Sequence, residues 1–336
     1  MSDVIDSTYL PFTKETIAEY LACANGQYRP EGNLLATGYY QQSAAKYQLF
    51  TGASENAKVF SLALLRNPRQ IEKDERIWTA AALITLDRCG DRWQNWNNVL
   101  RKAFGEQPPW IGETWLSLLG DELRLLLEVP MLSPKRYYEW LSKPEHYTAV
   151  KPVKYVRDVA AAVFSRPGTR QSPHARLEGA THADALLVSK TGFAVVFEAK
   201  VTSDISHSVS FDATRNQIAR VLDVILGDRD SKVFKPTTGD PRTWRDPDRT
   251  LFALLTPRSF KEEYRYTRLY GWLFDEYKRY GRGGSDLLLK HLPHRNAPGE
   301  LADIPTRMGW LTYQDCNEIL PTNDTHKAPC CWLEGN

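Results

Sequence analysis

The chain has 336 residues, of which 42% are hydrophobic and 25% charged, and a formal net charge of +2. This is the composition of a globular protein that can bury a large core without a metal or disulfide. No apolar run approaches the ~20 residues of a membrane span, and the start, MSDVIDSTYLPF, has no basic and apolar regions of an export signal. We therefore expect a cytoplasmic protein with no membrane partner.

Residues 1–150 show mostly the periodicity of helices, and strand-like alternation is missing. Helices are expected at residues 14–25, 54–67, 74–90 and 112–129. The last one ends before Pro130, because proline cannot continue a helix. The pattern predicts an α-helical N-terminal domain over residues 1–150, which would position a substrate or bind a partner.

The pattern changes after residue 150. Helices are expected at residues 153–165, 211–227 and 262–280, and strands at residues 176–189, 193–201, 250–257 and 308–316. Helix, strands, helix and strand in this order indicate an α/β domain. We place it at residues 151–336.

Two carboxylates and an ammonium interrupt the apolar pair of strands in this domain. Gly192 lies in the short connection between the strands and can adopt the positive φ of a tight hairpin. If the hairpin is centred on Thr191, Asp184 and Glu198 face each other with their Cβ atoms ~5 Å apart. Lys200 then shares their face, because it lies two residues after Glu198.

Two carboxylates at this distance repel each other by roughly 3 kcal/mol at an effective dielectric constant near 20. One carboxyl group must therefore keep its proton, or a cation must lie between them. The oxygens of Asp184 and Glu198, with a backbone carbonyl such as that of Ala199, favour Mg²⁺ or Mn²⁺ over zinc. Lys200 could orient a water or stabilise developing charge, so this set predicts metal-assisted hydrolysis of a phosphodiester.

Asp184 followed by Glu198-Ala199-Lys200 after a short hairpin resembles the D…(D/E)xK signature of the PD-(D/E)xK nuclease superfamily. The resemblance covers residues 151–315. It implies a restriction-endonuclease-like fold, a mixed sheet flanked by helices, with Asp184 and Glu198 as metal ligands and Lys200 as the catalytic lysine. Several members of the family have a glutamine on the next helix, and Gln217 has a comparable place.

Many members of this family also have an acidic residue on the first core helix. Asp158 is the acid on the expected helix at residues 153–165, but it lies off the apolar face. Glu178 precedes Asp184 by six residues and would share its face in a straight strand. We therefore take Glu178 as the candidate third metal ligand.

Other side chains could contact a nucleic acid. The segment from Arg229 to Arg295 has 15 Lys or Arg against 9 Asp or Glu, and its excess charge fits either a phosphate-facing or a solvated surface. Candidate phosphate contacts are Arg215, Arg220 and the arginines of residues 241–249, with His182, Asp204 and His207 near the same cleft. The tyrosines of residues 264–270 could stack on unpaired bases, although an amphipathic helix that buries them is the simpler expectation.

The sequence thus predicts a Mg²⁺- or Mn²⁺-dependent endonuclease that acts on nucleic acid, with DNA expected rather than RNA. Restriction, repair and defence against invading genomes all stay open as roles, and so does a homodimer. The alternative is a nuclease-like module that binds nucleic acid or protein without cutting. A third possibility is a structural ion pair between Glu198 and Lys200.

Overall fold

The computed structural model describes residues 4–6, 10–23, 27–43, 74–141, 143, 146, 180–206, 212, 214–228, 239–283 and 286–320. The helices expected at residues 54–67 and 153–165 lie outside these ranges. Among the described residues, no helix is long and apolar enough to cross a membrane.

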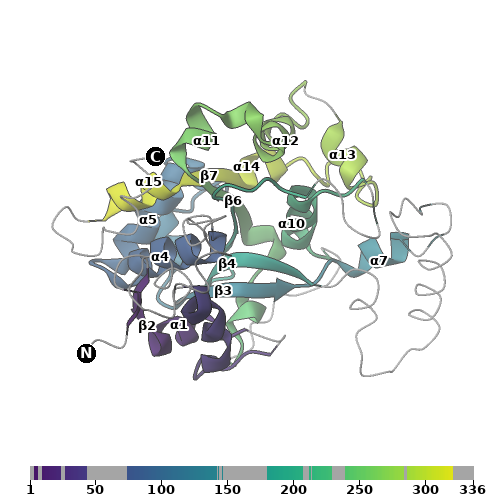
Figure 1. Ribbon diagram of the computed structural model, residues 1–336. Helices are drawn as coiled ribbons and strands as arrows, with labels where there is room; N and C mark the ends of the chain where they lie inside the picture. Colours follow the sequence, from purple (N-terminus) through teal and green to yellow (C-terminus); the bar gives the residue numbers. More distant parts are fainter. Residues whose placement is uncertain are drawn as a thin grey trace, which may run out of the picture.

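A mixed five-stranded sheet forms the centre of the molecule (Figure 1). In spatial order its strands are β3 (Leu123–Met131), β4 (Thr181–Ser189), β5 (Ala194–Ala199), β6 (Thr250–Thr256) and β7 (Met308–Thr312). The pairs β3–β4 and β4–β5 are antiparallel, whereas β5–β6 and β6–β7 are parallel. A small second sheet pairs β1 (Val4–Asp6) with β2 (Leu10–Thr13).

Helices cover both faces of the large sheet and confirm the expected α/β class (Figure 1). The helices before the hairpin are α1 (Lys14–Tyr20), α4 (Glu75–Arg88), α5 (Arg92–Phe104), α6 (Trp115–Leu119) and α7 (Lys135–Leu141), with the 3₁₀ turn η2 (Leu34–Thr37). Those after it are α10 (Gln217–Leu226), α11 (Arg258–Glu262), α12 (Leu269–Lys278), α13 (Leu287–His291), α14 (Ile304–Arg307) and α15 (Tyr313–Ile319), with the 3₁₀ turns η5 (Pro241–Trp244), η6 (Pro247–Arg249) and η7 (Arg265–Thr267).

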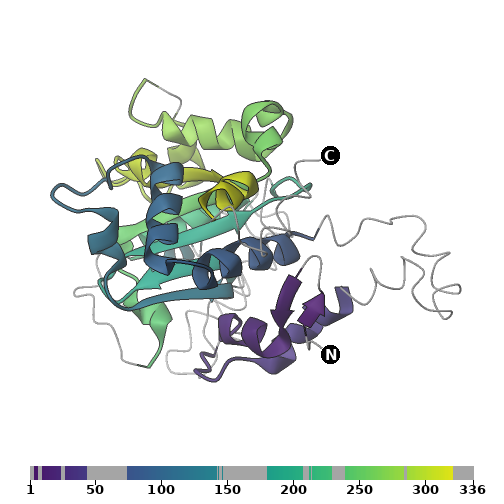
Figure 2. The same ribbon diagram turned by 90° about the vertical axis from the view of Figure 1, so that its left-hand side faces the viewer.

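Alternate residues of the central strands bury their side chains in two separate cores. On β5, Val195 and Phe197 pack with α4 and α5, whereas Ala194 and Val196 pack with α10 and α12. The helix α15, drawn in yellow, lies against α4 and α5 on the first of these faces (Figure 2). Because both faces are covered, the strands are apolar along nearly their whole length.

The helices that begin at the edge of the sheet start at polar caps. The Asp74 carboxylate accepts hydrogen bonds from the backbone N–H groups of Arg76 and Ile77 at the start of α4. The side-chain oxygen of Asn216 accepts one from the N–H of Ala219 at the start of α10. These caps fix where the first turns of both helices lie.

The prediction of one helix over residues 112–129 is wrong. The structure has the short helix α6, a break at Gly120 with φ of 58°, and then the strand β3. The leucines of this segment suggested a helix, but they pair with β4 and bury both faces of the strand. Pro130 fits because β3 is an edge strand, where a missing N–H is tolerated.

The sheet crosses the boundary that the sequence suggested near residue 150. β3 lies before this position and pairs along its length with β4, which lies after it. One core also contains side chains from α1 and α4 together with side chains from β5 and β6. Residues 1–150 therefore supply a strand and a covering layer of helices to the sheet, rather than a separate core among the described residues.

Candidate active site

Asp184 and Glu198 face each other across β4 and β5. The pairing of Ala185 with Phe197 fixes the register, and one further step along both strands brings residue 184 opposite residue 198. Gly192 has a φ of 97°, as the tight connection requires. The predicted hairpin and its register are confirmed.

The pair lies at the edge of the sheet where β5 and β6 end. The backbone N–H of Ala199 donates to Oδ2 of Asp184 at 2.7 Å, and the N–H of Lys200 donates to the carbonyl of Leu255 at 2.9 Å. The carboxyl ends of parallel strands are where open α/β sheets bind their ligands. The candidate residues thus lie where a ligand site is expected for this architecture.

The Lys200 ammonium is held by three acceptors. Its Nζ donates to Oε1 of Glu198 at 2.8 Å, to the carbonyl of Ala199 at 2.8 Å and to Oε2 of Glu75 at 3.4 Å. The side chain is buried, and an ammonium has three N–H groups to donate. Its position at the strand end is therefore determined by contacts on all three.

The two oxygens of Glu198 have different surroundings. Oε1 accepts from Lys200 and also from Nε2 of Gln217, at the first position of α10. Oε2 is buried and has no hydrogen-bond partner. Gln217 is itself fixed, because its backbone N–H donates to the carbonyl of Ser206 at 3.0 Å. One oxygen of a fully buried carboxylate therefore lacks a hydrogen-bond partner, on the residue that lies across from Asp184.

Burial and mutual repulsion disfavour the charged forms of both acids. Burial, and then the charge of Glu198, raise the pKa of Asp184 well above its usual value. Burial also raises the pKa of Glu198, and Lys200 offsets this only in part. Burial alone would lower the pKa of Lys200, but the carboxylates of Glu198, Asp184 and Glu75 raise it above the ordinary value. Lys200 is therefore a cation at neutral pH, and the acids need a further positive charge to ionise together.

Glu75 belongs to this cluster, and the sequence analysis missed it. It lies in the first turn of α4 and contacts, besides Lys200, the backbone N–H of Val201 and the hydroxyl of Ser203. The sequence carries one signal for it: two acids begin this helix, and only one is needed as its cap. Asp74 is that cap, which leaves the Glu75 side chain available.

The edge strand is irregular beside Asp184. Glu128 has a φ of 54°, a left-handed conformation that costs a non-glycine residue about 1–2 kcal/mol. It lies between Leu127 and Val129, which pair with Ala185 and Ala183 on either side of residue 184. Its carboxylate forms an ion pair with Arg76 at 3.1 Å. Backbone irregularities of this kind are concentrated beside functional sites.

The donors suit a divalent cation, although not with every predicted ligand. Asp184 and the open Oε2 of Glu198 are hard oxygen atoms, which Mg²⁺ and Mn²⁺ prefer. The carbonyl of Ala199, in contrast, accepts from Lys200 in this arrangement. Within the described ranges, no three His, Cys, Asp or Glu side chains are grouped closely enough to hold a metal ion by themselves. Water and substrate oxygens would have to supply the other ligands.

Three predicted residues, Glu178, Asp158 and His207, lie outside the described residues. His182 is exposed over much of its surface, but partial desolvation of its ring, together with the charges of Arg76 and Arg220, lowers its pKa. Asp204, which was expected near the cleft, has structural partners: its carboxylate accepts from the backbone N–H groups at the start of α12.

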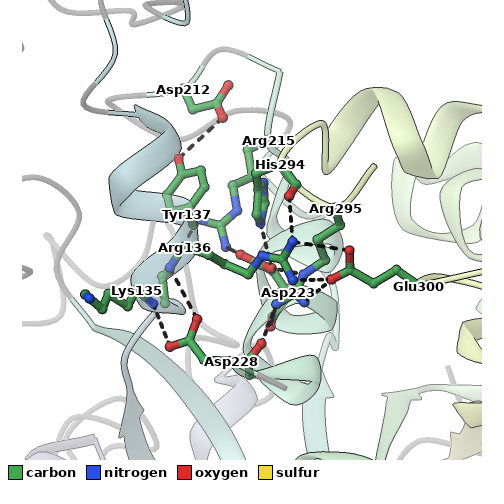
Figure 3. Close-up of polar contacts among 12 residues, drawn as sticks. Lys135, Arg136, Tyr137, Asp212, Arg215, Asp223, Asp228, His294, Arg295 and Glu300 are labelled. Carbon is green, nitrogen blue, oxygen red and sulfur yellow. Dashed lines mark hydrogen bonds and ion pairs between the residues drawn. The ribbon is translucent and has the colours of Figure 1, made fainter. Parts of the chain in front are cut away.

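Most of the arginines proposed as phosphate contacts have structural partners instead. Arg215 is fully buried and pairs with Asp223, which also binds His294 and Arg295 (Figure 3). The arginines of residues 241–249 bind Asp240, the carbonyl of Ile225 and Glu113. Arg220 is different, since its charge acts on both Glu198 and His182 and it lies one turn after Gln217. It is the described arginine of this set that lies near the acids.

Comparison of the chain with protein-family models, with curated proteins and with solved structures gives no match in any of the three.

Proposed function

We propose that this chain is a metal-dependent nuclease with a restriction-endonuclease-like core, which hydrolyses phosphodiester bonds of nucleic acid, with DNA expected. Asp184 and Glu198 would hold Mg²⁺ or Mn²⁺, and Lys200 would act on the reacting phosphate. The observation that carries the proposal is that Oε2 of buried Glu198 has no hydrogen-bond partner, while the residue lies opposite Asp184 and beside a fixed lysine.

The arrangement of the core supports the same proposal. An antiparallel meander of β3, β4 and β5 continues through α10 into the parallel strands β6 and β7. The two acids lie on adjacent strands of this mixed sheet, and a helix that carries Gln217 follows the lysine. The resemblance of the sequence to the PD-(D/E)xK superfamily implies the same order. Glu75 on α4 would then be the acid from a core helix, in place of Asp158.

Each side chain has a distinct part in the proposed reaction. A divalent cation, when bound, would supply Lewis-acid activation of the phosphate and of a water molecule. The Lys200 ammonium would stabilise negative charge on the phosphate as water adds to phosphorus and the bond to the leaving oxygen breaks. Gln217 keeps Glu198 in place, and Glu75 keeps Lys200 in place.

The test is cleavage of plasmid, linear duplex and single-stranded DNA, and of RNA, with Mg²⁺ or Mn²⁺. Lys200→Ala should lower the cleavage rate by about 10²-fold or more, the size of effect seen when a group that stabilises transition-state charge is removed. Lys190→Ala is the matched control, because Lys190 lies in the same hairpin but is exposed and pairs with Glu122. It should cleave like the wild type.

Two results would contradict the proposal. Equal cleavage by wild type and Lys200→Ala would mean that the lysine has no part in it. Absence of cleavage by the wild type on every substrate, with binding of nucleic acid retained, would favour a binding module that does not cut.

A further inference from the structure

Three large aromatic side chains project into solvent from one short part of the chain. Tyr264, Tyr266 and Trp272 are 50%, 67% and 46% exposed. They lie in the chain between the end of α11 and the middle of α12, two helices that are drawn near the top of Figure 1. Tyr270 and Tyr277 of the same segment are buried, so the expected burial of aromatics holds for only some of them.

The segment that carries them is held rigidly. A Cβ atom on Gly271 would lie 1.9 Å from the carbonyl oxygen of Arg265, so η7 packs directly on the backbone of α12. The Arg265 guanidinium pairs with Asp275, and the Tyr266 hydroxyl donates to Asp275 at 3.0 Å. Burial alone would raise the pKa of Asp275, but the hydrogen bonds from Arg265 and Tyr266 lower it.

The exposed side chains lie together with one arginine. Arg268 and Trp272 are one helical turn apart, and Trp272 is three residues before Asp275, the partner of Tyr266. Tyr264 packs edge-on against the ring of Phe260, and the Arg268 guanidinium lies 5.0 Å from the centre of that same ring. We call Tyr264, Tyr266, Arg268 and Trp272 the aromatic patch.

The charge around the aromatic patch suits a polyanion. Residues 258–282 contain seven Lys or Arg against four Asp or Glu. Arg268 pairs with no carboxylate among the described residues, and its buried Nε has no hydrogen-bond partner. A patch of this composition combines ring faces, which stack on bases, with a cation, which contacts phosphate.

The aromatic patch is connected to the candidate active site. The Asp204 carboxylate, four residues after Lys200, accepts from the N–H groups of Leu269 and Tyr270 at the start of α12. In addition, α11 begins two residues after β6, at the edge of the sheet where Glu198 lies. The strand-end loops therefore lead directly from the acids to the patch.

We propose that the aromatic patch binds unpaired nucleobases, so that the substrate of this site contains a single-stranded segment. The faces of bases are hidden in a duplex and open in a single strand, and rigidly held rings can stack only on open faces. The proposal rests on the proposed nuclease function for the cleavage that follows, but the binding itself needs no catalysis.

The test measures binding by the full chain carrying Lys200→Ala, without divalent metal, using fluorescence anisotropy. The probes are labelled oligothymidylate and a duplex of the same length, at one fixed salt concentration. Adding Tyr266→Ser and Trp272→Ser should raise the Kd for oligothymidylate by about tenfold or more, since each lost stack costs about 1–3 kcal/mol. The Kd for the duplex should change by less than about twofold.

Two controls separate stacking from other effects. Tyr266→Phe removes the hydroxyl contact with Asp275 but keeps the ring, so it should retain single-strand binding. Leu35→Ser with Ile111→Ser removes side chains that are 88% and 105% exposed elsewhere on the molecule, and should also leave binding unchanged.

Three results would overturn the proposal. The first is an unchanged Kd for oligothymidylate in the double variant Tyr266→Ser with Trp272→Ser. The second is tighter binding of the duplex than of the single strand by the parent chain. The third is that the double variant loses self-association but still binds nucleic acid. The last would identify the patch as an interface between copies. Because the parent chain carries Lys200→Ala, none of these results depends on whether the wild type cleaves.

Discussion

At the scale of single residues, Glu198 is the side chain whose surroundings demand explanation. A buried acceptor without a partner costs about 1–3 kcal/mol, and more when it is charged. Oε2 of Glu198 is such an atom, and the neighbouring Asp184 adds repulsion. A bound cation, as proposed, would remove this cost.

Asp184→Asn should therefore stabilise the protein in the absence of divalent metal. Asparagine removes the charge and can still accept the hydrogen bond from Ala199. We expect the free energy of unfolding in urea, with a chelator at pH 7, to rise by about 1 kcal/mol or more, since each unit of pKa shift corresponds to ~1.4 kcal/mol. Glu122→Gln, at an exposed ion pair with Lys190, should change it by less than about 0.5 kcal/mol. A loss of stability in Asp184→Asn would contradict this reading.

Asp223 should behave in the opposite way. Burial alone would raise its pKa, but His294, Arg215 and Arg295 lower it below the ordinary range. Its contribution to stability is complete above the unfolded-state pKa of about 4, and is lost as the pH falls below that value. Asp223→Asn should reduce the free energy of unfolding at pH 7 by about 3–5 kcal/mol, because it removes the buried carboxylate that Arg215 and Arg295 share.

The difference in free energy of unfolding between Asp223→Asn and wild type should shrink as the pH is lowered from 5 to 3. Urea unfolding at each pH measures it. A difference that stays constant over this range would show that Asp223 is not ionised through these partners. His294→Gln gives a milder comparison, because it keeps a donor to Asp223 and leaves the ion pairs with Arg215 and Arg295 in place.

Residues close in sequence were predictable, and residues brought together by the tertiary fold were not. The hairpin register followed from the position of Gly192 and the alternation of strand side chains, which are local properties. Glu75 lies on a helix far earlier in the chain, and no periodicity links it to Lys200. Arg215 was wrongly predicted to contact phosphate, because the sequence does not show that the fold of α10 brings Asp223 to its guanidinium.

At the scale of elements, the hairpin between β4 and β5 sets the geometry of the site. Its connection is closed by the N–H of Ser189, which donates to the carbonyl of Phe193 at 2.8 Å. Any change of the loop that shifts the register by one residue would turn Asp184 and Glu198 to different faces. The connection is thus a part of the site, although it lies at the opposite end of the strands.

Gly192→Ala should destabilise the protein by about 1–2 kcal/mol, because a Cβ atom disfavours a φ of 97°. Gly38→Ala is the matched control, since Gly38 has helical angles and open space around its Cα. It should be neutral or slightly stabilising in the same urea titration. Equal effects of the two substitutions would mean that the loop conformation does not require glycine.

The strand β3 shows why element type is hard to read from an apolar run. Leucines at residues 123–127 fit a buried helix and a buried strand equally well by periodicity. The neighbouring strand decides between helix and strand. The backbone N–H and C=O groups of β4 need partners along this side, and a helix at β3 would leave them unpaired.

At the scale of the whole molecule, the site is assembled from separate parts of the chain. Acids come from the antiparallel half of the sheet, while Glu75 comes from a helix on one face and Gln217 from a helix on the other. The first turns of α4 and α10 both lie at the end of β5, where they contact Lys200 and Glu198. A single core on each face holds these first turns in place, which explains why residues before 150 belong to the site.

The most direct test of the central claim is a calorimetric titration with Mn²⁺ at neutral pH and without nucleic acid. Wild type and Glu122→Gln should bind the ion with the same affinity, and Asp184→Asn should bind it at least tenfold more weakly. Equal affinities in wild type and Asp184→Asn would contradict the account and leave Glu198 and Lys200 as a structural ion pair.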